Sequence, residues 1–207
     1  MRENIDPKQT LSEIHSMMER SSRFISLSGL SGVSAGIIGL AGWIVAYLQI
    51  QNSRQDYILL GSSLGNKQLE HFLIIDAVIV LILALSAGVF FTTRKAKKDG
   101  NQIWNPVVRR MMINLAIPLF TGGVYCAILI WHEGIIFVAP STLIFYGLAL
   151  INTSKYTLSD IRYLGISEIF LGLAGMAWPD YGIILWLIGF SILHIIYGTI
   201  MYFKYER

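Results

Sequence analysis

The sequence predicts an all-helical integral membrane protein whose six transmembrane helices form three helical hairpins, and three observations lead to this class. First, 54% of the 207 residues are apolar and only 14% are charged, whereas charged residues make up about 25% of a soluble domain. Second, the chain contains six mainly apolar runs near the roughly 20 residues that a helix needs to cross a bilayer. Third, its basic residues gather on one side of these runs.

The six predicted spans follow one another with polar residues between them. They cover residues 26–48, 72–92, 111–130, 134–151, 163–178 and 182–203, so residues 25–207 form one transmembrane domain. The outer turns of the second and third hairpins are short, whereas residues 51–71 form a longer outer loop. The fifth span is short and ends at Trp178-Pro179, so we expect it to stand nearly upright or to thin the bilayer locally.

The orientation of the spans follows from the positions of Lys and Arg. Of the 16 such residues, all but Arg54 and Lys67 lie on the side that holds both termini. Because basic flanks stay in the cytoplasm, we expect both termini to be cytoplasmic. The net charge of +3 reflects these flanks, so we expect no nucleic-acid partner. The first apolar run is long enough to be a permanent span, so a cleaved signal peptide is not expected.

The cytoplasmic N-terminus, residues 1–24, has the pattern of an amphipathic helix. Thr10 and Glu13 have the spacing of a capping box, which marks the start of a helix. One apolar stripe follows, made of Leu11, Ile14, Met17 and Met18. A helix of this kind lies at the membrane surface or contacts a cytosolic protein.

The three hairpins share one plan, which predicts an internal repeat. An Arg precedes each odd span, and each even span ends in basic residues. Between the second and third hairpins the likeness extends to single residues, since Leu115-Ala116-Ile117 corresponds to Leu164-Gly165-Ile166 and Lys155-Tyr156 to Lys204-Tyr205.

The third hairpin reads LGISEIFLGLAGMAWPDYGIILWLIGFSILHIIYGTIM over residues 164–201. Its Gly-rich span, Pro-containing outer turn and second Gly-containing span resemble the short repeat of the HdeD-like membrane proteins, and the likeness extends loosely over residues 26–203. The resemblance implies a six-span, non-enzymatic protein of the bacterial cytoplasmic membrane with a role in acid or envelope stress tolerance. The longer first outer loop and the extended N-terminus depart from that family's pattern.

Small residues at helical spacing predict where the helices approach one another, because close backbone contact holds helices together in lipid. These packing residues are Ser28, Gly32 and Gly36 on the first span, Gly165, Gly172 and Gly175 on the fifth, and Gly198 on the sixth. The third span carries a polar stripe that we also expect to face the bundle, made of Asn114, Pro118, Thr121 and Tyr125. Small-residue columns also join subunits, so a homo-oligomer is an alternative use of the same faces.

Glu168 and His194 are the most informative residues, because ionisable groups inside a span are costly and normally have a partner. At 1.5 Å per residue, Glu168 lies about 9 Å and His194 about 15 Å from the inner end of their spans. Their depths therefore allow a contact or a bridge through one water. One hypothesis is an intramembrane proton or ion site that also includes Asn114 and Tyr125 of the polar stripe; the other is a structural hydrogen bond within the third hairpin.

No enzyme, cofactor or metal site is predicted. Ser31 lies in a Gly-x-Ser-Gly sequence of the kind found in rhomboid proteases, but its place on the first span favours helix packing instead. The single cysteine, Cys126, excludes an intramolecular disulfide. Acidic and His residues gather at the outer ends of the spans, where we expect a solvated rim: Glu70, His71, Asp76, His132, Glu133 and Asp180.

Three function classes remain open from the sequence. They are a non-enzymatic protein of stress tolerance, a proton-linked channel or transporter that uses Glu168 and His194, and a sensor or anchor that recruits a cytosolic partner through residues 11–18. A polar, water-filled cavity at Glu168 favours transport, whereas a dry, glycine-packed interior disfavours it.

Overall fold

The computed structural model describes residues 27–60 and 65–207, and every regular element in this part of the chain is a helix. The long helices are α2 (Gly29–Leu60), α3 (Gly65–Lys98), α4 (Pro106–Trp131), α5 (Val138–Thr153) and α6 (Asp160–Ala177). The last span is interrupted and consists of α7 (Gly182–Leu187), the π-helix η4 (Ile188–Leu193) and α8 (His194–Tyr205). Three short 3-10 turns complete the order: η1 (Ile135–Phe137), η2 (Ser154–Tyr156) and η3 (Pro179–Tyr181).

In the part of the chain that the structure describes, five stretches are long and apolar enough to cross a membrane, as in a membrane protein. They are Gly29–Ser53, Lys67–Lys98, Pro106–Trp131, Ile135–Tyr156 and Pro179–Tyr205. The predicted fifth span corresponds to α6, which is not among them. Its 18 residues include three charged side chains, Asp160, Arg162 and Glu168.

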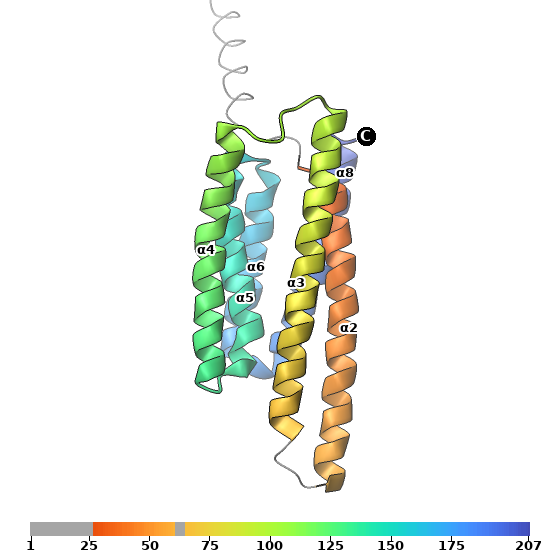
Figure 1. Ribbon diagram of the computed structural model, residues 1–207, viewed down its shortest axis with the longest axis vertical. Coiled ribbons are helices and arrows are strands. Elements are labelled where there is room, and N and C mark those ends of the chain that lie inside the picture. The colour runs from red at the N-terminus through yellow and green to blue at the C-terminus, as the bar shows by residue number, and fades with distance from the viewer. Residues whose placement is uncertain (1–26, 61–64) are drawn as a thin grey trace, which may run out of the picture.

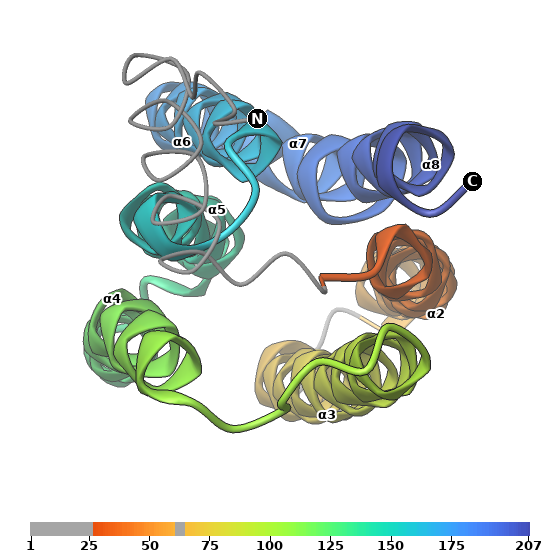
Figure 2. The same ribbon diagram turned by 90° about the horizontal axis from the view of Figure 1, so that it is seen from above.

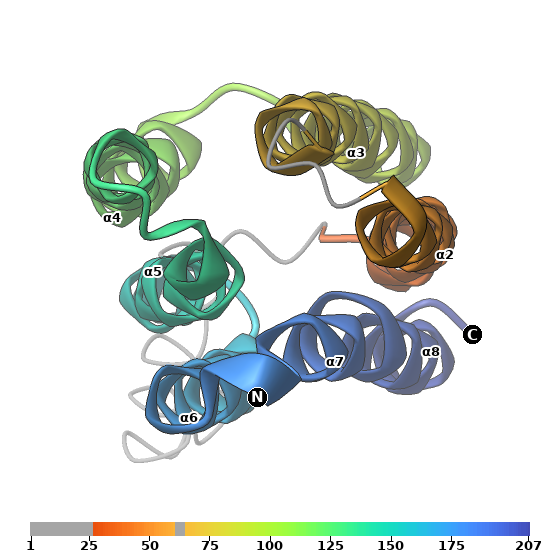
Figure 3. The same cartoon turned by 90° about the horizontal axis from the view of Figure 1, so that it is seen from below.

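The three hairpins pack into an incomplete ring (Figures 2 and 3). Helices α2 and α3 form the first hairpin, α4 and α5 the second, and α6 with the interrupted last span the third. The third hairpin lies between the other two, because α6 packs on α5 while η4 and α8 pack on α2. Helices α3 and α4 are therefore the two ends of the ring.

The prediction of a long outer loop at residues 51–71 is wrong. Helix α2 continues to Leu60 and α3 begins at Gly65, so most of this segment is helical. A 32-residue helix is about 48 Å long, against about 30 Å of bilayer hydrocarbon. The first hairpin consequently reaches well beyond the neighbouring helices at one end of the bundle (Figure 1).

The closest helix contacts fall at glycines. Gly198 of α8 faces the backbone of α2, where an added Cβ would lie 2.5 Å from the Val33 nitrogen. Between α5 and α6, Gly147 and Gly165 face each other in the same way, and an added Cβ at Gly165 would lie 2.7 Å from the Gly147 carbonyl oxygen. Because no side chain fits at these points, the backbones themselves form the interface.

The other glycines of the expected columns also lie at helix contacts. Gly32 lies against the Gly198 Cα, and Gly36 against Ile195 and the Ser191 carbonyl. On α6, Gly172 and Gly175 both lie against Pro140 of α5. The predicted amphipathic helix with Leu11, Ile14, Met17 and Met18 falls outside the described residues.

Candidate functional site

Three helices bring ionisable and polar side chains together in the interior of the bundle. Glu168 comes from α6, His194 is the first residue of α8, and Tyr146 comes from α5. Glu168 is 0% exposed and His194 is 5% exposed. The Nδ1 atom of His194 lies 3.4 Å from Oε1 of Glu168, so the structure places the two predicted residues beside each other. We call these three residues the interior triad.

The hydrogen bonds of His194 define which of its nitrogens carries a proton. Nδ1 lies 2.9 Å from the carbonyl oxygen of Gly189, and because a carbonyl only accepts, Nδ1 is the donor. Nε2 lies 2.9 Å from the Tyr146 hydroxyl. In a neutral imidazole Nε2 accepts from that hydroxyl, whereas in an imidazolium it donates to it. The Tyr146 hydroxyl therefore forms a hydrogen bond with His194 in both charge states of the ring.

The carboxyl group of Glu168 is enclosed without a hydrogen bond. Neither of its oxygens has a hydrogen-bond partner among the described residues. A Cβ added at Gly189 would collide with Oε2 of Glu168 and lie 2.5 Å from Leu143 Cδ2. Glycine at position 189 thus leaves the space that the carboxyl group occupies.

Charge balance limits the protonation states of the pair. Glu168 and His194 together are neutral when they hold one exchangeable proton, either as carboxylic acid with imidazole or as carboxylate with imidazolium. Removing that proton leaves a buried carboxylate without hydrogen bonds, and adding a second leaves a buried imidazolium. Both charged states are costly away from water. Glu168 and His194 are therefore expected to share one exchangeable proton.

The backbone beside the triad is irregular. The π-helix η4 occupies residues 188–193, contains Gly189 and ends directly before His194. Single π-turns within helices occur frequently at functional sites. Aromatic rings line this turn, since Phe190 lies 5.0 Å from Tyr146 and 5.8 Å from His194 between ring centroids.

Tyr146 and Gly189 are the site residues that sequence reasoning missed. Tyr146 lies seven residues before Thr153 at the end of α5, about 10 Å in depth. This matches the depth of Glu168, so a comparison of depths for every polar residue in the spans would have included Tyr146. Gly189 gave no such signal among the many glycines of the chain.

Asn114 and Tyr125, the other predicted site residues, do not join the triad. The Asn114 side chain donates to the Arg110 carbonyl in its own helix. Tyr125 is 40% exposed and its ring lies 5.5 Å from that of Phe145. The prediction that their stripe faces the bundle is therefore wrong for Tyr125 and for Thr121, which is also exposed.

The physical reason lies in the position of α4 at one end of the ring. This helix has α5 as its main neighbour, so only one of its faces is covered. Gly122 selects that face, because an added Cβ there would lie 2.5 Å from the Phe145 Cβ. The buried residues of α4 are accordingly Val108, Met111, Gly122 and Cys126.

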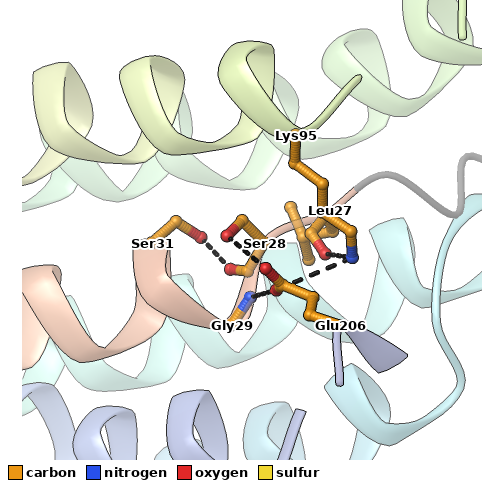
Figure 4. Close-up of polar contacts among 6 residues, drawn as sticks. All are labelled: Leu27, Ser28, Gly29, Ser31, Lys95 and Glu206. Carbon is orange, nitrogen blue, oxygen red and sulfur yellow. Dashed lines mark hydrogen bonds and ion pairs between the residues drawn. The ribbon is translucent and has the colours of Figure 1, made fainter. Parts of the chain in front are cut away.

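A second polar cluster joins the ends of three helices near the C-terminus (Figure 4). The Glu206 carboxylate accepts hydrogen bonds from the Gly29 backbone N–H and, at 3.3 Å, from the Ser28 hydroxyl. Lys95 Nζ lies 3.6 Å from Glu206 and donates to the Leu27 carbonyl at 2.9 Å. A carboxylate at the first turn of α2 stabilises that helix end, because it satisfies free N–H groups and complements the helix dipole.

The two residues before Glu206 bind the start of α6. Lys204 Nζ and the Tyr205 hydroxyl donate to Asp160 Oδ2 at 2.9 and 2.8 Å. The hydrogen bond from Lys204 lowers the pKa of the Asp160 carboxyl below its ordinary value, and the Tyr205 bond adds to this. We call Lys204, Tyr205 and Glu206 the C-terminal clasp, since they connect the ends of α2, α3 and α6.

The acidic and His residues of the outer rim form no compact site. Asp76 of α3 lies on the side facing α2, where an added Cβ at Gly42 would be 3.6 Å from its Oδ2. Within residues 27–60 and 65–207, no group of three or more His, Cys, Asp or Glu residues is placed to hold a metal ion.

Comparison of the chain with protein-family models, with curated proteins and with solved structures gave no match. The resemblance to the HdeD-like proteins therefore stays a prediction.

Proposed function

We propose that the protein is a proton-linked transporter of the bacterial cytoplasmic membrane, with both termini in the cytoplasm and with Glu168 and His194 as its proton-carrying pair. The observation that carries this proposal is the enclosed Glu168 carboxyl group, whose oxygens have no hydrogen-bond partner among residues 27–60 and 65–207 while His194 Nδ1 lies 3.4 Å away. A group that served only to hold helices together would be expected to have its hydrogen bonds satisfied.

Glu168 lies in a dry, glycine-packed interior, which disfavours an open pathway, so a transporter with this site must alternate between this closed state and a second, hydrated one. Glu168 is 0% exposed, and its Oε2 lies against Gly189. Proton exchange with either aqueous side requires a second conformation. We assign this change to the last span, because its π-turn has a less regular hydrogen-bond pattern than the flanking helices.

Proton flux into vesicles tests the proposal. The full-length protein is reconstituted into liposomes that contain a pH-sensitive dye, and the external pH is lowered from about 7.5 to about 5, a range that includes the ordinary titration of His. Wild type is compared with Glu168→Gln and His194→Ala. Glu133→Gln is the matched control, since it removes an exposed carboxylate from the turn after α4.

We expect flux in the wild type and in the control Glu133→Gln, and loss of flux in Glu168→Gln and His194→Ala. Each variant must elute as a folded species in gel filtration. Absence of wild-type flux above that of empty liposomes would contradict the proposal. In that case the interior triad is structural, and the stress-tolerance and partner-binding functions become the better hypotheses.

A further inference from the structure

Five exposed basic residues flank the connection between α3 and α4. They are Arg94, Lys97 and Lys98 near the end of α3, and Arg109 and Arg110 near the start of α4. We call them the basic rim. The connection runs along the same end of the bundle as the C-terminus (Figure 1). None of the five forms a salt bridge with a carboxylate in the described part of the chain.

The basic residues at the end of α3 point in two directions, three of them outward and one inward. Arg94, Lys97 and Lys98 have the spacing of three and four residues that places side chains on one helical face, and all three are exposed. Lys95 instead points inward to Leu27 and Glu206 (Figure 4). Lys95 thus forms the ion pair with Glu206, and the side chains of Arg94, Lys97 and Lys98 remain available to an external anion.

The two arginines of α4 lie at an unfavourable place for cations. Helix α4 begins at Pro106, so Arg109 and Arg110 occupy its first turns, and no acidic residue lies in the first turn. The positive end of the helix dipole repels them. An anion at this position would relieve that repulsion and would also be attracted by the helix end.

The connecting segment carries the apolar side chains of a membrane-surface anchor. Trp104 is 68% exposed and Ile103 is 38% exposed. Tryptophan is enriched at the level of the lipid headgroups. With Trp104 at that level, the basic rim on either side of it lies at the level of the lipid phosphates.

We infer that the basic rim binds the headgroups of anionic phospholipids. The charge of the rim is complementary to the lipid phosphate, Trp104 fixes the depth, and no carboxylate of the described residues forms a salt bridge with the rim. This inference concerns the end of the bundle and does not depend on the proposed proton transport at the interior triad.

Native mass spectrometry of the full-length protein in detergent tests the inference. Phosphatidylglycerol and phosphatidylcholine with identical tails are titrated in separate samples, and inorganic phosphate is a third probe. The rim variants are Arg109→Gln with Arg110→Gln, and Lys97→Gln with Lys98→Gln. The matched control is Lys155→Gln with Arg162→Gln, which removes two exposed cations elsewhere in the cytoplasmic-side sequence.

We expect phosphatidylglycerol to bind in preference to phosphatidylcholine, each rim variant to lower its affinity about tenfold, and the control to leave it unchanged. Equal binding of both lipids would overturn the inference. An equal loss of affinity in the control would also overturn it, since any pair of exposed cations would then contribute as much as the rim. Complete displacement of phosphatidylglycerol by inorganic phosphate would show that the rim binds a free anion instead of a lipid.

Discussion

At the scale of single residues, the environment of Glu168 depends on the small size of Gly189 and on the fixed orientation of the His194 ring. Gly189 leaves space for the carboxyl group, and its carbonyl holds the imidazole of His194 through Nδ1. Tyr146 holds the same ring through Nε2. With both nitrogens engaged, the ring is fixed in the orientation that keeps Nδ1 beside Glu168.

Replacing Tyr146 with Phe tests this arrangement. The variant Tyr146→Phe removes the hydroxyl at Nε2 of His194, so we expect a loss of about 1 kcal/mol in the free energy of unfolding. We also expect a shifted pH dependence of proton flux, because the hydroxyl serves both charge states of the ring. Chemical unfolding in detergent and the vesicle assay provide the two readouts.

Tyr197→Phe is the matched control for this prediction, since Tyr197 packs against the same apolar cluster as Tyr146 and its hydroxyl has no hydrogen bond to another described residue. Equal effects of the two substitutions on the pH dependence would show that the Tyr146 hydroxyl has no specific role.

The sequence identified Glu168 and His194 because ionisable residues inside spans are rare, and their depths matched. Tyr146 was not identified, since tyrosine is ordinary in membrane helices and its hydroxyl becomes informative only when a partner is known. Asn114 and Tyr125 lie apart from the triad, because a polar stripe shows that a face differs from its surroundings but not which neighbour covers it.

At the scale of helices, the main contacts depend on backbone approach at glycine. The variant Gly198→Ala would place a methyl group 2.5 Å from the Val33 nitrogen and 2.7 Å from the Gly29 carbonyl oxygen. We expect α2 and α8 to separate slightly and the free energy of unfolding to fall by about 1–3 kcal/mol. Thermal unfolding in detergent measures the change.

Gly88→Ala in α3 is the control, because nothing lies within 4 Å of an added Cβ there. Alanine favours a helix over glycine, so this variant should be neutral or slightly more stable. A decrease in Gly88→Ala as large as that in Gly198→Ala would contradict the assignment of the contact.

The ends of the helices were predicted less well than their centres. Residues 51–60 are polar enough to suggest a loop, yet helix α2 continues through them. A helix that leaves the membrane satisfies its backbone hydrogen bonds internally, so polarity there marks the membrane boundary and not the helix end. The π-turn within the last span was also not predicted, because its residues remain apolar throughout.

The contact of Lys204 in the C-terminal clasp with Asp160 of α6 predicts a pH-dependent stability. Lys204 lowers the pKa of Asp160 in the folded protein, so the contact stabilises the fold above the unfolded value of about 3.9. This contribution is lost as the pH falls through the lowered folded value. We expect Asp160→Asn to lower Tm by about 1–3 °C at neutral pH, and by less at about pH 3.

Thermal scans of wild type and Asp160→Asn at both pH values measure this difference. The variant Asp180→Asn is the control, since Asp180 lies in the turn before α7. A Tm difference between wild type and Asp160→Asn that grows on acidification would contradict the assigned direction.

At the scale of the whole molecule, the sequence predicted an all-helical membrane protein but not the order of helices around the ring. Small-residue columns predicted contact faces on the first, fifth and sixth spans, without naming the partner of each face. The pairings of α5 with α6 and of α2 with α8 depend on the shapes of both surfaces. These pairings are what bring Tyr146, Glu168 and His194 to one place.

Infrared difference spectroscopy of the protein in vesicles tests the central claim, that the Glu168 carboxyl group exchanges a proton inside the bundle. Spectra are recorded after a change from about pH 8 to about pH 5, the range in which His and perturbed carboxyl groups titrate. We predict a carbonyl band of a carboxylic acid that changes with pH in the wild type and is absent from Glu168→Gln. A wild-type spectrum without any pH-dependent band assignable to Glu168 would contradict the account.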